Sequence, residues 1–441
     1  MSHCVPRAQV GQGVAVLTNG EEAVGTRTDG MPAILGGTPV RTDPWPCYDK
    51  GDTWLSTADE DAAIEAIRRR LYFRYDFRPF AETYTGRFEQ RLCEYFGVQH
   101  ALACASGTAA IALGLLGLSL DPHAPVACPA FTFAATPSAI LLANCRPVLV
   151  ECDENLHLDV ADLRRALAEG VRAVLVVHMR GFASDLPAIC AAAAEYGVPV
   201  IEDAVPALGA TLGGRPLGTF GRAGAFSTQS DKSLNTGEGG FLLTDDEELF
   251  AKAIVYSGAY EGRLARHFPT GRPPIDDLAY PIYGIRMDEI RAALAGALLD
   301  RLPARLAAHR RNHDHVTAGL SDVPGLALRQ PVAPGAYLGE ALVFRLPGAT
   351  ATQSAWMAAA LRAEGIDARA LADPGDHNVR AFWNWRFLVG PDADEARARL
   401  PETARYLGEA VDVPLSANLT PADCDELVAA VRKVLPAVPD R

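Results

Sequence analysis

Apolar and polar segments alternate along residues 101–244 in a pattern that predicts strands and helices in turn. Short apolar runs such as VRAVLVVHM (171–179) and VPVIED (198–203) lack a polar face, which indicates strands covered on both sides. The predicted strands are 101–105, 125–128, 147–151, 173–178, 198–203, 224–228 and 240–244, and the predicted helices are 107–118, 134–143, 159–169, 186–196 and one beginning at 246. The pattern predicts an α/β fold, a three-layer sandwich with a mainly parallel sheet between helices.

Helices are also predicted before this alternation, and the pattern after it is mixed. Helices are predicted at 57–71, opened by the capping-box sequence TADE, at 87–96, at 287–306 with a kink at Pro303, at 353–364 and at 421–434, with one strand at 341–344. Residues 1–30 have no clear periodicity, and we expect a loosely ordered arm. Because 441 residues are too many for one small core, we predict a large domain over 31–310 and a smaller C-terminal α+β domain over 311–441.

Composition and charge narrow the class of protein. The formal net charge of −13 disfavours a nucleic-acid binder, which needs a basic face. No apolar run approaches the roughly 18 residues of a membrane-spanning helix. The nine cysteines form no C-x-x-C pair, and the N-terminus lacks a signal-peptide pattern. We expect a protein of the reducing cytoplasm with no nucleic-acid or membrane partner.

The sequence HRRNHDH (309–315) is the strongest candidate for a metal site. His309, His313 and His315 fall in a charged stretch that follows a predicted helix, where a solvated face is the favoured interpretation. Neither an H-E-x-x-H sequence nor paired cysteines support a metal centre. We predict no metal.

The most informative chemistry is a lysine and a carboxylate at strand ends. Lys232 lies in STQSDKSLNTGEGG (227–240), just after one predicted strand, and Asp203 ends another. Ligands of parallel sheets bind outside the carboxyl ends of the strands, which places both residues on one rim. A pyridoxal phosphate enzyme needs this pair: the amine holds the cofactor aldehyde as a Schiff base, and the carboxylate keeps the pyridine nitrogen protonated. Separately, a helix N-cap and a surface lysine are ordinary interpretations.

Two nearby motifs strengthen this prediction. SGTAA (106–110) joins a strand to a helix, so backbone N–H groups and the Thr108 hydroxyl could hold a phosphate, although a plain helix start looks similar. FTF (131–133) offers an aromatic ring to stack on the cofactor, although aromatic residues at such places more often belong to the core. In the small domain, Trp383 and Trp385, with His377, would either meet the substrate or pack in the core, and the sequence leaves both open.

Over residues 31–435 the chain resembles the DegT/StrS-type sugar and aminocyclitol aminotransferases, fold type I pyridoxal phosphate enzymes of antibiotic-sugar and aminocyclitol pathways. The resemblance is carried by TYTGRFEQRLCEYFGVQHALACASGTAAIAL, CPAFTFAATPSAI, VIEDAVPALGA, FSTQSDKSLNTGEGG and VPLSANLT. The opening MPAILGGTPVRTDPWP is similar to the start of the subgroup that aminates scyllo-inosose with glutamine.

The resemblance implies a role for each candidate residue. It implies Lys232 as Schiff-base and proton-transfer residue, Asp203 as pyridinium partner, Ser227 with Gly107 and Thr108 on the phosphate, and Phe133 on the ring. It also implies a homodimer with sites at the subunit interface. The reaction implied is transfer of an amino group from glutamate or glutamine to a keto-sugar, keto-cyclitol or related ketone in secondary metabolism.

The chain departs from the family pattern at three positions. Pro206 replaces a glutamine that hydrogen-bonds the cofactor's phenolic oxygen, Leu208 replaces a histidine, and Gly284 replaces an asparagine that reaches the neighbouring subunit's phosphate. Proline cannot donate that hydrogen bond. The alternatives are therefore a redirected reaction (elimination, decarboxylation, epimerisation or bond formation) and a non-catalytic cofactor-binding partner or regulator. Retention of Lys232 argues against the dehydratase branch of the family, which has histidine there.

Overall fold

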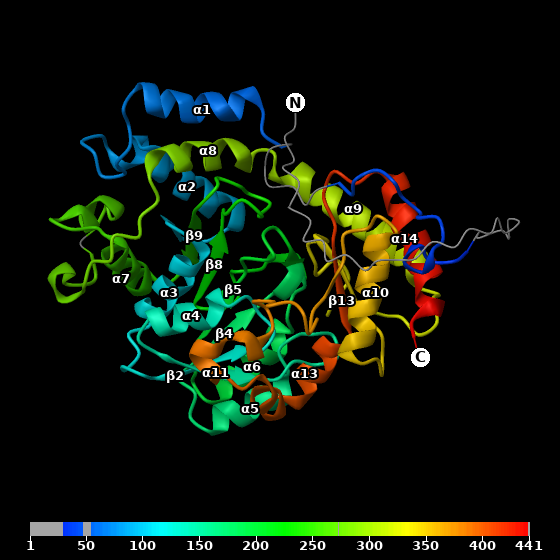
Figure 1. Ribbon diagram of the computed structural model, residues 1–441. Helices are drawn as coiled ribbons and strands as arrows, with labels where there is room; N and C mark the ends of the chain where they lie inside the picture. Colours follow the sequence, from blue (N-terminus) through cyan, green and yellow to red (C-terminus); the bar gives the residue numbers. More distant parts are fainter. Residues whose placement is uncertain (1–29, 47–53, 272, 440–441) are drawn as a thin grey trace, which may run out of the picture.

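The computed structural model describes residues 30–46, 54–271 and 273–439, so nearly all of the predicted arm over 1–30 lies outside the described residues. The centre of the fold is a seven-stranded sheet in the order β1-β9-β8-β5-β4-β2-β3 (Figure 1). Its strands are β1 His100–Cys104, β2 Pro125–Pro129, β3 Arg146–Val150, β4 Ala173–Val177, β5 Val200–Asp203, β8 Ala223–Ser227 and β9 Gly240–Thr244. Only β9 runs antiparallel to its neighbours, which confirms the predicted mainly parallel sheet.

Helices cover both faces of this sheet and confirm the predicted three-layer sandwich. One face carries α3 Gly107–Gly117, α4 Ala135–Leu142 and α7 Glu247–Ser257, and the other carries α2 Tyr84–Phe96, α5 Val160–Ala168, α6 Leu186–Glu195 and α8 Glu289–Leu299, with α1 Thr57–Arg68 packed on α8. Helix α3 packs closely on α7 because Gly117 has no side chain. A Cβ there would lie only 2.6 Å from Leu249 Cγ. Within the described ranges, no helix is both long and apolar enough to cross a lipid bilayer.

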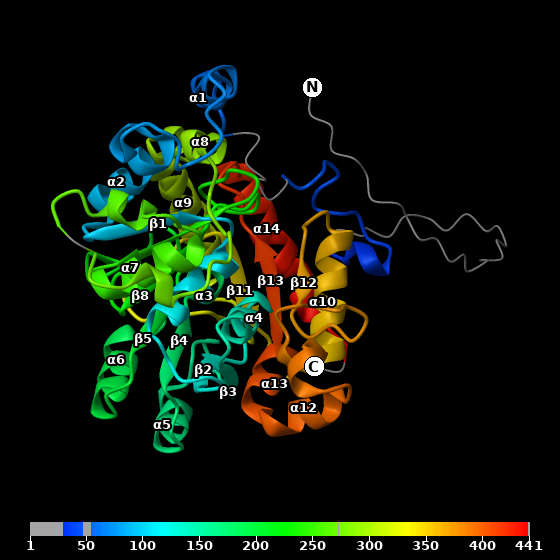
Figure 2. The ribbon, with the colours of Figure 1, turned by 90° about the vertical axis from the view of Figure 1, so that its left-hand side faces the viewer.

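A second, antiparallel sheet of four short strands lies beside the first (Figure 2). Its order is β10-β11-β13-β12, with β10 Ala327–Leu328, β11 Ala341–Arg345, β12 Arg369–Ala370 and β13 Ala410–Pro414. Its core is shared with α9 Leu302–Leu320, α10 Ala351–Ala363 and α14 Pro421–Val434. The remaining elements are the hairpin of β6 Thr211–Leu212 and β7 Arg215–Pro216, the helices α11 Arg386–Val389, α12 Ala393–Arg399 and α13 Pro401–Gly408, and 3-10 helices at Ala33–Leu35, Phe80–Glu82, Met179–Gly181, Arg263–His267, Asp277–Ala279, Phe382–Asn384 and Leu435–Ala437.

The predicted helix over 287–306 is two helices, and the prediction of a kink at Pro303 is wrong. Helix α8 ends at Leu299 and α9 begins at Leu302, so Asp300 and Arg301 separate the two helices. Pro303 therefore lies in the first turn of α9, where its missing N–H has no carbonyl to bind. The predicted domain boundary at residue 310 falls inside α9 and stays a prediction.

Two smaller differences concern helix α1 and the histidine cluster. The capping box of α1 is built by Ser56 and Asp59, one residue earlier than the predicted TADE pattern. The histidines of HRRNHDH lie within α9, and the prediction of a solvated face is wrong for His309 and His313, which are buried. His309 Nδ1 is 3.0 Å from the Leu415 carbonyl oxygen. Among the described residues no group of three or more His, Cys, Asp or Glu side chains could hold a metal ion.

Candidate cofactor-binding site

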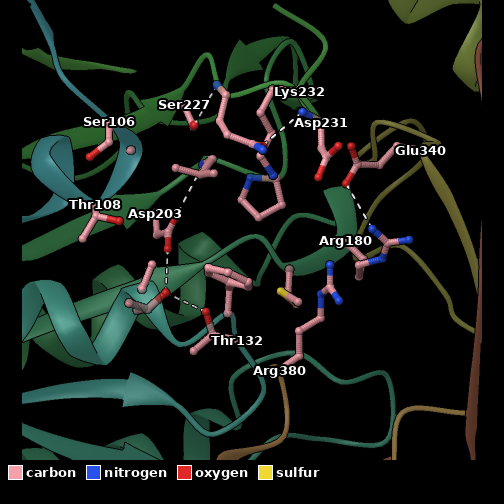
Figure 3. A pocket seen from close by; sticks show the side chains of 18 of the residues that line it. Ser106, Thr108, Thr132, Arg180, Asp203, Ser227, Asp231, Lys232, Glu340 and Arg380 are labelled. Atoms are coloured by element: carbon pink, nitrogen blue, oxygen red, sulfur yellow. Dashed lines mark hydrogen bonds and ion pairs between the residues drawn. The ribbon is translucent and has the colours of Figure 1, made fainter. Parts of the chain in front are cut away.

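A cavity of about 550 Å³ opens at the carboxyl ends of the parallel strands, between the two sheets. All six predicted site residues line it: Lys232, Asp203, Ser227, Gly107, Thr108 and Phe133. Figure 3 shows Ser106, Thr108, Ser227 and Asp203 on one side, Arg180, Glu340 and Arg380 on the other, and Lys232 between them. Segments far apart in sequence thus meet at the rim that strand order predicts.

The first turn of α3 forms one end of the cavity. Ser106 is the N-cap, and its hydroxyl accepts a hydrogen bond of 3.1 Å from the Ala109 amide. The amides of Gly107 and Thr108 have no intrahelical partner, as at any helix start, and they line the cavity. The space in front of these two amides is called the phosphate cradle below. A Cβ at Gly107 would lie 2.8 Å from Ser227 Cβ, so only glycine leaves this cradle open. The arrangement suits a phosphate group.

The GEGG sequence after Lys232 lets β9 pass tightly against this cradle. A Cβ at Gly240 would lie 2.7 Å from the Gly107 amide nitrogen and 2.5 Å from the Phe226 carbonyl oxygen. Gly239 has φ +143° and would place a Cβ 2.4 Å from Thr228 Oγ1. Glycine is therefore required at positions 239 and 240, because a side chain at either position would collide with residues at this end of the cavity.

Asp203 is a buried carboxylate held in place by hydrogen bonds. Its Oδ2 accepts from the Thr136 hydroxyl at 2.8 Å, and its Oδ1 accepts from the Val205 amide at 3.2 Å. Thr132 and Thr136 hydroxyl oxygens are 2.7 Å apart, so with the Thr136 proton on Asp203, Thr132 donates to Thr136. Burial raises the pKa of Asp203, and the Thr136 hydrogen bond opposes this shift. Such a carboxylate suits a cationic partner.

Lys232 lies on the loop between β8 and β9, and its side chain reaches into the cavity (Figure 3). Burial lowers the pKa of its amine, the carboxylate of Glu340 opposes this shift, and the positive charges of Arg180 and Arg380 reinforce it. A lowered pKa favours the uncharged amine, which is the nucleophilic form.

Several charged residues of the cavity were not predicted from the sequence, among them Arg180, Glu340, Arg380 and Asp412. Arg180 Nη2 is 2.8 Å from Asp412 Oδ1, and its Nη1 is 3.7 Å from Glu340 Oε1. Arg180 has φ 54°, a left-handed conformation that costs energy for a residue with a side chain. It follows β4 closely, so the rule that placed Asp203 on the rim would also have found it.

The departures from the family pattern fall in different environments. Pro206 lines the cavity, whereas Leu208 is buried in a core cluster. Gly284 is exposed, with φ +66°, and is not among the lining residues. Phe133 is 50% exposed, so its ring is available to a molecule in the cavity.

Trp383 and Trp385 pack in the core and do not line the cavity, which settles the open alternatives for them. Trp385 is 1% exposed, and its Nε1 donates to the Val379 carbonyl at 2.8 Å. Trp383 is buried in the same cluster. His377 is exposed and is absent from the cavity wall.

The residues present fit pyridoxal phosphate. A glycine cradle with two helix-start amides matches the phosphate, a buried carboxylate matches the ring nitrogen, and an amine favoured in its neutral form matches the aldehyde.

Comparisons with known proteins agree with this chemistry. The sequence profile of the DegT/DnrJ/EryC1/StrS aminotransferase family matches residues 81–432. The chain is 31% identical over 427 residues to the L-glutamine:scyllo-inosose aminotransferase of Streptomyces griseus, covering 92% of this chain and 98% of that protein. It is 30% identical over 352 residues to the GDP-perosamine synthase of Caulobacter vibrioides, covering 79% and 89%. The fold is similar, with TM-score 0.73 and 18% identity over 90% of this chain and 99% of the other, to the Helicobacter pylori aminotransferase involved in the biosynthesis of pseudoaminic acid.

Proposed function

Because the chain belongs to the DegT/DnrJ/EryC1/StrS aminotransferase family, we propose that it moves an amino group from glutamine or glutamate to a keto-cyclitol, a keto-sugar or a related ketone. The protein is an aminotransferase, and its cofactor is pyridoxal phosphate. The observation that carries the proposal is the meeting of Lys232, Asp203 and the α3 N-terminus in one cavity.

Different residues of the cavity would bind different parts of the cofactor. When bound, pyridoxal phosphate supplies a conjugated ring that takes up the electrons of the donor's broken C–H bond. Gly107, Thr108 and Ser227 would hold its phosphate, and Phe133 would lie against its ring. Asp203, fixed by Thr136, would keep the ring nitrogen protonated.

Lys232 has two tasks in this proposal. It would hold the cofactor through its aldehyde until the donor's amine displaces it. Its freed amine would then take a proton from the donor's α carbon and deliver it to the cofactor. The lowered pKa of Lys232 keeps the amine able to accept that proton. The acceptor ketone would receive the amino group by the same steps in reverse.

Transfer of labelled nitrogen tests the function. With glutamine labelled with ¹⁵N at its α-amino group, we expect mass spectrometry to find the label on a keto-cyclitol such as scyllo-inosose or on a nucleotide-linked keto-sugar. Unlabelled ketone and an unchanged donor, in every acceptor reaction, would contradict the proposal. Release of the label as ammonia would instead support a redirected reaction.

We also propose that the protein is a homodimer whose interface adjoins the cavity. Leu278, Ile282 and Tyr283 are exposed apolar residues, with Leu278 89% exposed, on a segment that continues to Ile285. The Ile285 carbonyl accepts a hydrogen bond of 2.9 Å from the Ala105 amide, directly before the phosphate cradle. Such exposed apolar area is typical of an interface. Light scattering should give twice the 47.0 kDa of one chain, and a single-chain mass would contradict the dimer.

A cytoplasmic location remains part of the proposal. The cysteines within the described ranges are all free thiols, and most are buried, which fits a reducing compartment. Fractionation of the producing cells should recover the protein with cytoplasmic enzymes, and recovery outside the cell would contradict this.

A further inference from the structure

Arg180 is a charged residue of the cavity that the proposed chemistry leaves without a role. It lies in the turn Met179–Gly181, directly after β4, and lines the cavity. Burial lowers the pKa of the Lys232 amine, and the carboxylate of Glu340 opposes this shift. The charge of Arg180 reinforces the shift, more strongly than that of Arg380 does. The Arg180 guanidinium therefore acts at the atom that would bind the cofactor aldehyde.

The backbone on either side of Arg180 is fixed by contacts. The Met179 carbonyl accepts a hydrogen bond of 2.7 Å from Nη1 of Arg329, a buried residue. A Cβ at Gly181 would lie 3.3 Å from the Pro206 carbonyl oxygen, so the turn packs against Pro206. These contacts hold Arg180 in its left-handed conformation, with φ 54°.

Two carboxylates hold the side chain of Arg180. Its Nε and Nη2 lie 3.1 and 2.8 Å from Asp412 Oδ1, and its Nη1 lies 3.7 Å from Glu340 Oε1. All three residues are buried. A guanidinium has five N–H donors, more than the two that bind Asp412. It can therefore keep these partners and also donate to a ligand in the cavity.

The anchors of the cofactor determine which edge of its ring would face Arg180. In pyridoxal phosphate the aldehyde lies between two ring substituents, the arm that carries the phosphate and the ring hydroxyl. Figure 3 shows Lys232 between Thr108, at the phosphate cradle, and Arg180 on the other side. With the phosphate in the cradle and the aldehyde at Lys232, the ring hydroxyl would face the side of Arg180. Pro206, which also lines the cavity, has no N–H to donate to it.

We propose that the Arg180 guanidinium donates a hydrogen bond to the ring oxygen of bound pyridoxal phosphate and stabilises this oxygen as an anion. The inference rests on the cofactor position given in the proposed function. A charge-assisted hydrogen bond of this kind favours the ionised oxygen. The same cation disfavours a proton on the nitrogen that joins Lys232 to the cofactor, so it lowers the pKa of that nitrogen.

A pH titration of the cofactor-loaded protein tests this role without turnover, because the absorbance band of the bound cofactor reports the proton on the joining nitrogen. In Arg180→Gln the transition of the band should move up by about one pH unit or more, since loss of the cation raises that pKa. Arg180→Lys keeps the charge but loses the planar fork, and it should show a smaller upward shift. Arg369→Gln is the control: Arg369 is half-exposed and ion-paired with Asp376, so the transition should stay within about 0.3 pH unit of wild type.

A cofactor analogue separates a hydrogen bond from a general effect of charge. Deoxypyridoxal phosphate, which lacks only the ring hydroxyl, retains the aldehyde and the phosphate. Equilibrium dialysis gives the preference of each protein for pyridoxal phosphate over this analogue. The preference should fall about 10-fold in Arg180→Gln, because a hydrogen bond from a charged donor is lost, and should stay within about twofold of wild type in Arg369→Gln.

The outcomes distinguish this inference from the proposed function. If Arg180→Gln keeps both the band transition and the cofactor preference of the wild type, the inference is wrong, and the function stands as long as the wild type transfers nitrogen from glutamine. A shifted band in Arg380→Gln but not in Arg180→Gln would also overturn it. A wild type that binds the cofactor but transfers no nitrogen would contradict the function, while the titration still decides the role of Arg180.

A second variant keeps the test decisive if Arg180→Gln does not fold. Arg180→Gln leaves the buried carboxylate of Asp412 without its cation, which is destabilising. The double variant Arg180→Gln with Asp412→Asn removes both charges and takes its place in the dialysis. A preference for pyridoxal phosphate equal to that of the wild type would then contradict the hydrogen bond, and a fall of about 10-fold would support it.

Discussion

Replacing Lys232 with alanine is expected to reduce the rate of amino transfer by about 10⁴-fold or more, because one side chain supplies both the covalent hold on the cofactor and the proton transfer. The fold should persist, since Lys232 lies on a loop and not in a core cluster. The measurement is the steady-state rate of aminated product, with circular dichroism to confirm folding. A small primary amine added to the variant should restore part of the rate by replacing the missing base.

A matched lysine provides the control for this experiment. Lys252 lies on α7 in an ion pair with Glu248 and does not line the cavity. Lys252→Ala should retain near wild-type turnover. Turnover of Lys232→Ala at the wild-type rate would remove Lys232 from the mechanism.

The second large effect is expected at Asp203. Asp203→Asn keeps the size of the side chain and can still accept from Thr136, but it removes the negative charge. Without that charge the ring nitrogen would lose its proton, and the ring would then withdraw the donor's electrons less strongly. We therefore expect kcat to fall by about 10²- to 10³-fold. Single-turnover rates with saturating donor would measure this.

Cofactor binding distinguishes an electrostatic role for Asp203 from a structural one. The phosphate cradle does not involve Asp203, so the asparagine variant should still bind pyridoxal phosphate. Thr136→Val, which removes a hydrogen bond but no charge, should have a smaller effect on kcat. An Asp203→Asn rate equal to that of wild type would show that this carboxylate is not the ring's partner.

Sequence patterns predicted the large sheet well because its strands are short, apolar and separated by helices. Residues 173–177 are apolar on both faces, and they form the wholly buried strand β4. The same reasoning failed at α9, where arginines and histidines obscure the helical pattern although His309 and His313 are buried. The predicted kink at Pro303 was wrong because proline is disfavoured inside a helix but tolerated in its first turn, where Pro303 lies.

The candidate site could be predicted only where chemistry coincides with a strand end. Glu202 and Asp203 are adjacent carboxylates that point to opposite faces of β5, and only Asp203 lines the cavity. Glu202 instead accepts backbone hydrogen bonds from Gly218, Phe220 and Gly221. Glu340 and Arg380 were missed because they reach the cavity from the region of the second sheet. A local sequence pattern does not indicate which distant segments pack against each other.

The absorbance spectrum of the purified protein with pyridoxal phosphate, before and after glutamine, glutamate and alanine are added separately, tests the central claim most directly. The account predicts a protein-bound cofactor band that depends on Lys232, and its replacement by the band of the aminated cofactor when glutamine or glutamate is added. A bound cofactor that no donor converts would contradict the proposed amino transfer. Absence of any bound cofactor would contradict the site itself.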